Sequence, residues 1–273
     1  MQPIETRRGS SPVILGMPHT GTHVPAGTWK RLNDLGRELA DTDWHIHQLY
    51  DGLLPDATVV RATYHRYVID ANRDPADITL YPGQNSTSLI PSTDFNGRPI
   101  WKAGQEPNAD EVASLVKTLH TPYHDALRAE IKRVREIHGT AILYDCHSIR
   151  SIIPFLFEGT LPDFNIGTNS GRSCDSRIEV AALDVASHAE GYTYALNGRF
   201  KGGWTTRHHG QPHRGVHAIQ MELTQSTHLQ RESAPFAYDP DKAEKIRVHL
   251  ANILRRIEAT AVVISVRAKK GIS

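Results

Sequence analysis

The stretch TAILYDCHS (140–148) joins an apolar run to a polar end. A short apolar run closed by polar residues is typical of a buried strand. PVILGMPHTGTH (12–23) repeats the arrangement and presents His19 after its apolar run, and VHAIQMEL (216–223) carries Glu222 within a third candidate strand. Because helical patterns lie between these stretches, we predict an α/β fold with a mixed, mostly parallel sheet flanked by helices. In such sheets, ligands bind beyond the carboxyl ends of the strands.

The spacing of apolar residues along the chain predicts the other elements. Helices are predicted over 32–54 (either continuous or broken near Thr42), 111–138 (divided near Pro122), 177–189 and 241–261. Strands are predicted over 12–18, 57–62, 66–70, 140–145, 192–196 and 216–223, and loops over 71–106 and 154–175. A long loop in a compact domain is more often functional than idle, so residues 76–106 are expected to form either a moving lid or a fixed wall.

Composition favours a single compact domain over residues 1–273, since no repeat or Gly/Ser-rich linker divides the chain. Lys and Arg total 31 and Asp and Glu total 30, which argues against nucleic acid or a membrane surface as a partner. No apolar run approaches the length of a membrane span, and MQPIETRRGSS at the start lacks the apolar core of a signal peptide. With only two cysteines, a reducing, cytoplasmic location is expected.

The polar residues at the strand ends indicate metal chemistry. The chain has 16 histidines, and two of them, His19 and His147, follow or end apolar runs. Imidazoles and carboxylates delivered by separate strands suit a catalytic zinc, which takes three protein ligands and keeps a fourth position for water. Glu222 could then take a proton from that water. The alternative is that each histidine is simply a polar loop residue.

The block YHRYVIDANR (64–73) supplies candidate cations. Arginine donates in a planar fork, so Arg66 and Arg73 suit a carboxylate ligand or a developing oxyanion. The alternative is a structural ion pair between Arg73 and Asp70. Arg207, which follows the Gly-rich loop GRFKGGW (198–204), is a third candidate cation.

Three further polar residues have simpler interpretations. Asp43 could cap the helix that follows it. Strand alternation places Cys146 on the face opposite Asp145 and His147, in the core, which argues against a nucleophilic role. Ser148 is not surrounded by a G-x-S-x-G elbow, so it lacks the usual setting of a serine nucleophile.

Beyond these separate signals, the chain resembles the N-formylglutamate amidohydrolase family over nearly its whole length. The resemblance implies a single metal and a fold like that of the zinc carboxypeptidases and aspartoacylase-type deacylases. It also implies hydrolysis of N-formyl-L-glutamate to formate and L-glutamate, the last step of one route of histidine degradation. The blocks that carry it are PHTGTHVP (18–25), DTDWHIHQLYD (41–51), YHRYVIDANRDP (64–75), PYHDAL (122–127), DCHSIRSIIPFLFEGTLPDFNIGTN (145–169) and GRFKGGWTTRHHGQPHRGVHAIQMEL (198–223).

The resemblance also assigns roles to individual residues. His19 and His147 take the places of two zinc ligands, and Glu222 resembles the general base. Asn72 and Arg73 resemble an Asn-Arg pair that grips a substrate carboxylate.

One position departs from the related deacylases, because Thr22 stands where a metal-binding carboxylate is usual. Asp43 is our choice for the third ligand. Asp145 is the alternative, and it is the better candidate for orienting His147 from outside the ligand set.

The substrate implied by the resemblance is a small N-formyl amino acid with two carboxylates. Arg66 is expected to stabilise the oxyanion, and Arg73 and Arg207 to bind the two carboxylates. The cofactor is expected to be one divalent metal ion, most simply Zn²⁺. Two rival functions are a deacylase or peptidoglycan-type amidase acting on another amide, and a binding module without catalysis.

Overall fold

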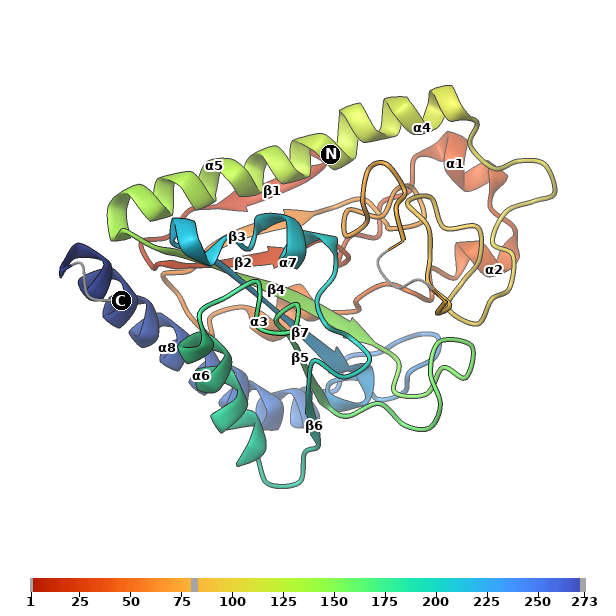
Figure 1. Cartoon of the computed structure of the whole chain (residues 1–273). Helices are drawn as coiled ribbons and strands as arrows, with labels where there is room; N and C mark the ends of the chain where they lie inside the picture. The colour runs from red at the N-terminus through yellow and green to blue at the C-terminus, as the bar shows by residue number, and fades with distance from the viewer. Residues whose placement is uncertain (1, 80–82, 271–273) are drawn as a thin grey trace.

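One mixed sheet runs through the computed structural model, which describes residues 2–79 and 83–270 (Figure 1). Its strands are β1 (Ile4–Arg7), β2 (Val13–Met17), β3 (Thr58–Ala62), β4 (Ala141–Ile149), β5 (Phe164–Gly167), β6 (Tyr194–Leu196) and β7 (Val216–Thr224). They lie in the order β1-β3-β2-β4-β7-β5-β6. β3, β2, β4 and β7 are mutually parallel, whereas β1 and β5 run antiparallel to their neighbours β3 and β7. The prediction of a mixed, mostly parallel sheet is confirmed.

Helices cover both faces of this sheet (Figure 1). They are α1 (Ala26–Arg31), α2 (Asp34–Arg37), α3 (Ile46–Tyr50), α4 (Ala109–Leu115), α5 (Thr121–His138), α6 (Ser176–Ser187), α7 (Trp204–His209) and α8 (Pro240–Lys270). Short turns of other helix types lie at Val116–His120, Pro212–Arg214 and Gln225–Thr227. α5 packs on one face, and α3, α6 and α8 pack on the other. No helix in the described part of the chain is long and apolar enough to cross a membrane.

Alternation along β4 divides the core and creates the site. Ile142, Tyr144 and Cys146 pack on the side of α6 and α8, as predicted for Cys146. Leu143 points to the side of α5, and by the period-two pleat Asp145 and His147 follow it. Polar side chains, Asp145 and His147 among them, occupy the carboxyl end of this face.

The helix predicted over 32–54 is not continuous, and the alternative of a break near Thr42 is confirmed. Only α2 and α3 form, and residues 38–45 between them make buried turns. The apolar spacing is real, since Leu32, Ile46 and Leu49 are fully buried. Contacts of the intervening acidic residues with other segments override the helical preference of this stretch.

The strand predicted over 66–70 is also wrong, although its apolar residues are buried. Val68 N–H donates to His65 O at 2.9 Å, which closes a turn in place of a strand. The loop predicted over 154–175 contains β5, and β1 was not predicted. Strands 12–18, 57–62, 140–145 and 216–223 are confirmed in position, with β4 extending to Ile149.

The helix predicted over 111–138 is continuous. In place of a division near Pro122, its geometry changes from α to π and back to α. α4 passes through a π turn at Val116–His120 directly into α5, and Pro122, which has no N–H to donate, lies just after this π turn. Helices 177–189 and 241–261 are confirmed as α6 and α8, and α8 continues to Lys270.

Candidate active site

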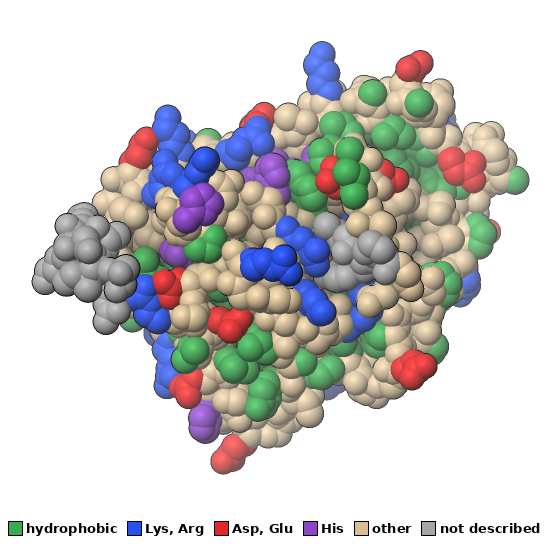
Figure 2. Space-filling view, in the orientation of Figure 1, with side chains coloured by type: hydrophobic (Ala, Val, Ile, Leu, Met, Phe, Trp, Pro, Cys, Tyr) green, Lys and Arg blue, Asp and Glu red, His purple; other side chains and the backbone are tan. Residues whose placement is uncertain are grey.

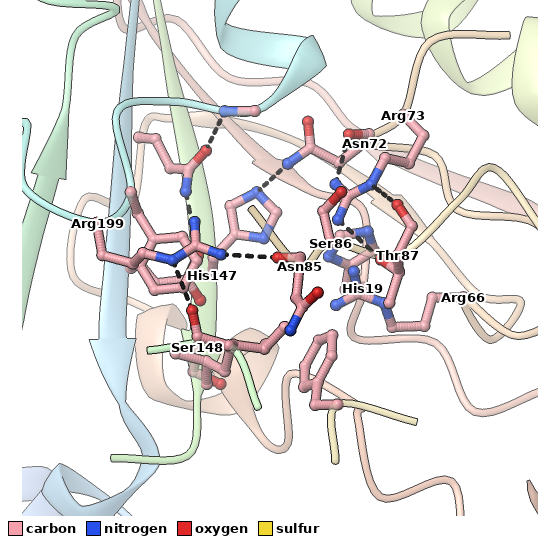
Figure 3. A pocket seen from close by; sticks show the side chains of 17 residues that line it. His19, Arg66, Asn72, Arg73, Asn85, Ser86, Thr87, His147, Ser148 and Arg199 are labelled. Atoms are coloured by element: carbon pink, nitrogen blue, oxygen red, sulfur yellow. Dashed lines mark hydrogen bonds between the residues drawn. The ribbon is translucent and has the colours of Figure 1, made fainter. Parts of the chain in front are cut away.

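Three potential metal ligands, His19, Asp43 and His147, meet at the carboxyl end of the sheet. One ligand atom from each lies within 4.8 Å of the others. Figure 3 shows the two histidines. Asp43 Oδ2 is 3.0 Å from His147 Nδ1 and 3.7 Å from His19 Nδ1. All three side chains are at most 2% exposed. The structure therefore brings the predicted trio together.

Local backbone geometry places these three residues. His19 follows β2, and His147 lies near the end of the neighbouring strand β4. Asp43 comes from the buried turn before α3, and its N–H donates to His19 O at 3.0 Å. The N-cap of α3 is His45, so Asp43 does not cap that helix.

Two other carboxylates hold the outer nitrogens of the imidazoles. Asp70 Oδ1 lies 2.7 Å from His19 Nε2, and Asp145 Oδ2 lies 3.1 Å from His147 Nε2. Asp43 thus faces the inside of the cluster, and Asp145 contacts His147 from outside it. Such outer carboxylates fix the ring orientation and tautomer of metal-binding histidines.

The donor set fits a divalent metal. His19 Nδ1 is buried and has no hydrogen-bond partner among the described residues. A buried polar atom without a partner is costly, and a cation between the two Nδ1 atoms and Asp43 would satisfy it. Two imidazoles and one carboxylate are a common ligand set for catalytic zinc.

Burial and neighbouring charges act differently on the two imidazoles. Burial, assisted by Arg66, lowers the pKa of His19, so this ring is neutral and able to bind a metal. Burial also opposes charge on His147, but Asp145 and Asp43 outweigh it and raise the pKa of that ring well above its usual value. The two carboxylates therefore favour a positive charge at His147, which either a proton or a metal ion could supply.

Glu222 lies at the end of β7, next to β4, in register with His147. Gln220 Nε2 donates to Glu222 Oε2 at 3.1 Å, and Gly203 N–H donates to Gln220 Oε1 at 2.7 Å. The Gly-rich loop before α7 thus orients Glu222 through Gln220. Burial is the main reason that the pKa of Glu222 rises to about 8, a value suited to a group that exchanges protons near neutrality.

The segment 64–73 turns its polar residues toward the cluster. Arg66 Nη2 donates to Asp70 Oδ2 at 2.6 Å, and Arg66 Nη1 lies 3.9 Å from Asp43 Oδ1. The guanidinium also lies over the ring of Phe95, 4.8 Å from its centroid. Burial disfavours the charge of Arg66, but Asp70 and Asp43 outweigh it and raise its pKa.

Asn72 is fixed between the cluster and α7. Its Nδ2 lies 3.2 Å from His147 Nε2, and its Oδ1 accepts from Thr205 N–H at 2.8 Å. A Cβ atom at Gly203 would overlap this side-chain amide. The Gly-rich loop can therefore approach Asn72 only because residue 203 lacks a side chain.

Two histidines of the α4–α5 helix hold the backbone around Asn72. His124 Nε2 donates to Ala71 O at 2.7 Å, and His120 Nε2 donates to Arg73 O at 2.9 Å. His124 Nδ1 is 3.1 Å from His209 Nε2 of α7. These contacts explain how a segment without regular secondary structure keeps its shape.

A cavity opens beside the cluster and encloses about 590 Å³ of space, part of it open to solvent. Its walls include His19, His147, Glu222, Asn72, Arg66 and Arg73. Arg207 is not among the described residues that line it, and its Nε donates to Gly202 O at 2.9 Å. Arg199, from the loop after β6, lines the cavity in its place (Figure 3).

Asp70, Gln220 and Arg199 are the site residues that the sequence analysis did not assign to the site. Asp70 lies in the quoted block 64–73, where a carboxylate beside two arginines was interpreted as structural. Gln220 precedes Glu222 by two, which places both on one face of a strand and was a usable signal. Nothing in the Gly-rich loop distinguishes Arg199 from Arg207.

Comparison with known proteins gives consistent matches. The model of the N-formylglutamate amidohydrolase family matches residues 11–229. The chain is 45% identical to an N-formylglutamate deformylase of Pseudomonas aeruginosa over 93% of this chain and 95% of that protein. It is 45% identical to an N-formylglutamate deformylase of Pseudomonas putida over 92% and 94% of the two chains.

Among solved structures, an N-formylglutamate amidohydrolase from Ralstonia eutropha has a similar fold. The two chains align over their full lengths with a TM-score of 0.74 and 21% sequence identity. At this identity the likeness concerns the fold.

Proposed function

The chain belongs to the N-formylglutamate amidohydrolase family, and we propose on this premise that it hydrolyses N-formyl-L-glutamate to formate and L-glutamate. The observation that carries the proposal is an arginine-lined cavity whose wall includes His19 and His147, two members of the cluster with Asp43, together with Glu222. This combination offers a metal site, a base and cations for an anionic substrate.

We assign His19, Asp43 and His147 as ligands of one divalent ion, with zinc the best match to two imidazoles and a carboxylate. A bound zinc ion polarises a carbonyl oxygen and lowers the pKa of water. Asp70 and Asp145 hold the two rings in the orientation that directs Nδ1 inward.

Glu222 is the proton carrier of the proposed reaction. Its carboxylate takes a proton from the water that attacks the formyl carbon. It then gives this proton to the amide nitrogen as the C–N bond breaks, so that glutamate leaves as a neutral amine. The hydrogen bond from Gln220 fixes one carboxylate oxygen and leaves the other to exchange the proton.

Arg66 is placed to stabilise the oxyanion that develops on the formyl oxygen. It lines the cavity and is held by Asp70, so it needs no reorganisation during the reaction. Its buried position strengthens the interaction, because a low-dielectric surrounding screens charge weakly.

Arg73 is our choice for the α-carboxylate of the substrate. Its Nε donates to Thr87 O at 2.7 Å and its Nη2 donates to Thr87 Oγ1 at 2.8 Å, which fixes the guanidinium at the cavity wall. Arg73 and its neighbour Asn72 both line the cavity.

A serine-based mechanism has less support. Ser148 lines the cavity, but its Oγ has no hydrogen-bond partner among the described residues. A serine nucleophile needs an adjacent base to accept its proton.

The test is formate release from N-formyl-L-glutamate by purified protein, before chelation, after chelation and after zinc is added back. We expect turnover that chelation removes and zinc restores. N-acetyl and N-formimino amino acids are measured in parallel. Faster turnover of one of these would replace the proposed substrate, and turnover by protein shown to be metal-free would remove the metal from the mechanism.

A further inference from the structure

We infer that Arg199 binds the side-chain carboxylate of the substrate and makes the enzyme selective for acidic N-formyl amino acids. The inference rests on the proposed function and extends it to a residue outside the metal cluster. It also replaces Arg207, which we had expected in this role and which the structure leaves outside the cavity lining.

The charge of the cavity wall is the first argument. Among the described residues that line it, Arg66, Arg73 and Arg199 are cationic and Glu222 is the one carboxylic acid. Arg66 is matched by Asp70 and Asp43. Arg73 and Arg199 are two further cations of this wall, one for each carboxylate of the substrate. Figure 2 shows Lys and Arg side chains gathered near the middle of this face of the molecule.

The placement of the two arginines is the second argument. Arg73 follows Asn72 in the 64–73 segment, whereas Arg199 comes from the loop after β6. Figure 3 shows them on opposite sides of His147 and Asn85. N-formyl-L-glutamate carries its two carboxylates at opposite ends of a short chain, so cations on opposite walls can each bind one of them.

The immediate surroundings of Arg199 suit a carboxylate with an apolar stem. Its Nε donates to Leu156 O at 3.0 Å and its Nη2 donates to Asn85 O at 2.9 Å. Carbonyl partners orient a guanidinium without removing its charge. Leu156 and Phe200 also line the cavity, and the guanidinium carbon lies 5.2 Å from the Phe200 ring centroid. These apolar groups can contact the two methylene groups of a glutamate side chain.

The test compares N-formyl-L-glutamate with N-formyl-L-glutamine, which has the same shape without the charge. We expect wild-type protein to prefer the glutamate substrate in kcat/KM by about 10- to 100-fold, the usual strength of hydrogen bonds to a charged group. In Arg199→Met we expect this preference to fall to about threefold or less, mainly through a higher KM for the glutamate substrate. Arg199→Lys keeps the charge and should keep part of the preference.

A second role of Arg199 must be separated from the first, because its hydrogen bonds also join the loops at Asn85 and Leu156. If Arg199 only holds these loops, Arg199→Met will slow both substrates equally and the preference will persist, which overturns the inference. Arg172→Met, at an exposed arginine, is the matched control and should change neither value.

If the proposed function itself is wrong, the experiment gives a result that differs from the failure of the Arg199 inference. Wild-type, zinc-loaded protein would then hydrolyse neither compound. In that case calorimetric titration with L-glutamate and L-glutamine still measures the charge preference without turnover. Equal affinity of wild-type protein for the two would then count against Arg199 as the carboxylate ligand.

Discussion

Each imidazole of the metal cluster carries a carboxylate on the nitrogen that faces away from the cluster. Asp70 holds His19, and Asp145 holds His147. Such pairing keeps the inward nitrogen unprotonated when the metal binds and removes the rotational freedom of the ring. Asp43 differs, because its carboxylate faces both rings and is the third member of the proposed ligand set.

This difference predicts unequal effects of two matched substitutions. Asp145→Asn should lower zinc affinity by about 10- to 100-fold, as loss of an outer partner usually does. Asp43→Asn should lower it further, because a ligand is removed. Zinc affinity is measured by competition with a chromophoric chelator, with Asp110→Asn, at an exposed residue, as control. If zinc affinity fell further in Asp145→Asn than in Asp43→Asn, Asp145 would be the ligand and Asp43 the outer partner.

Substitution of Glu222 tests the proton carrier. Glu222→Gln keeps the size of the side chain and removes the proton acceptor, so kcat should fall by about 10²- to 10⁴-fold while zinc content and KM change little. The measurement is steady-state formate release together with metal analysis. Glu190→Gln, at an exposed residue, is the control. Wild-type turnover in Glu222→Gln would exclude the general-base role.

At the scale of elements, the loop before α7 connects the proton carrier to the substrate-binding segment. Gly203 N–H donates to Gln220, and the absence of a side chain at Gly203 admits the amide of Asn72. One backbone position thus sets the geometry of two functional groups.

Gly203→Ala should therefore disturb the site more than the fold. The added methyl group must displace Asn72 or the start of α7, and we expect kcat/KM to fall by at least about tenfold with a stability loss of about 1–3 kcal/mol. Gly27→Ala in α1 is the matched control, since a Cβ there meets nothing within 4 Å. Activity and urea unfolding are measured for both. Unchanged activity in Gly203→Ala would show that the loop adapts.

The elements that the sequence predicted well are those whose pattern reflects burial on the sheet. β2, β4 and β7 are continuous buried runs, and α6 and α8 have one apolar stripe each. The departures from regular structure over 32–54 and 66–70 share a cause. In both, buried apolar residues mimic a regular element, while acidic residues such as Asp43 and Asp70 turn the chain toward histidines that are distant in sequence. Local patterns do not contain that information.

At the scale of the whole molecule, several histidines outside the group formed by His19, Asp43 and His147 are buried, and burial favours their neutral form. Burial lowers the pKa of His209 to about 3 and those of His217 and His228 to about 4. In the unfolded chain a histidine titrates near 6.5. As pH falls below about 6.5, the unfolded state gains protons that the folded state does not. The stability that these groups contribute is therefore full above that pH and is lost progressively down to about pH 4 for His217 and His228 and about pH 3 for His209.

His217 offers a test of this acid sensitivity. It lies near the start of β7, and its Nδ1 accepts from Asp175 N–H at 3.2 Å. The fall in unfolding free energy between pH 7.5 and pH 5 should be about 2 kcal/mol smaller in His217→Gln than in wild-type protein. Urea unfolding at both pH values measures it, with His213→Gln, at an exposed residue, as control. If the unfolding free energy fell by the same amount in His217→Gln as in His213→Gln, His217 would not contribute to the acid sensitivity.

For the molecule as a whole, the sequence predicted the site better than the path of the chain between site residues. His19, His147 and Glu222 each lie at the end of a strand, so parallel strands were enough to bring them together. Arg199 lies in the Gly-rich stretch 198–204 and Arg207 shortly after it, and only the fold determines which of them lines the cavity. The orientation of a loop side chain depends on the segments packed against it, and those are known only after folding.

The strand order has a consequence for biosynthesis. β2 and β3 are made early, whereas β4, which carries His147, is made much later and pairs with β2, and β7 joins the other edge of β4 later still. His19 and Asp43 therefore leave the ribosome long before their third partner exists. A nascent chain can assemble the trio only after β4 has paired with β2, so the proposed cation would meet a complete set of ligands only when the centre of the sheet has formed.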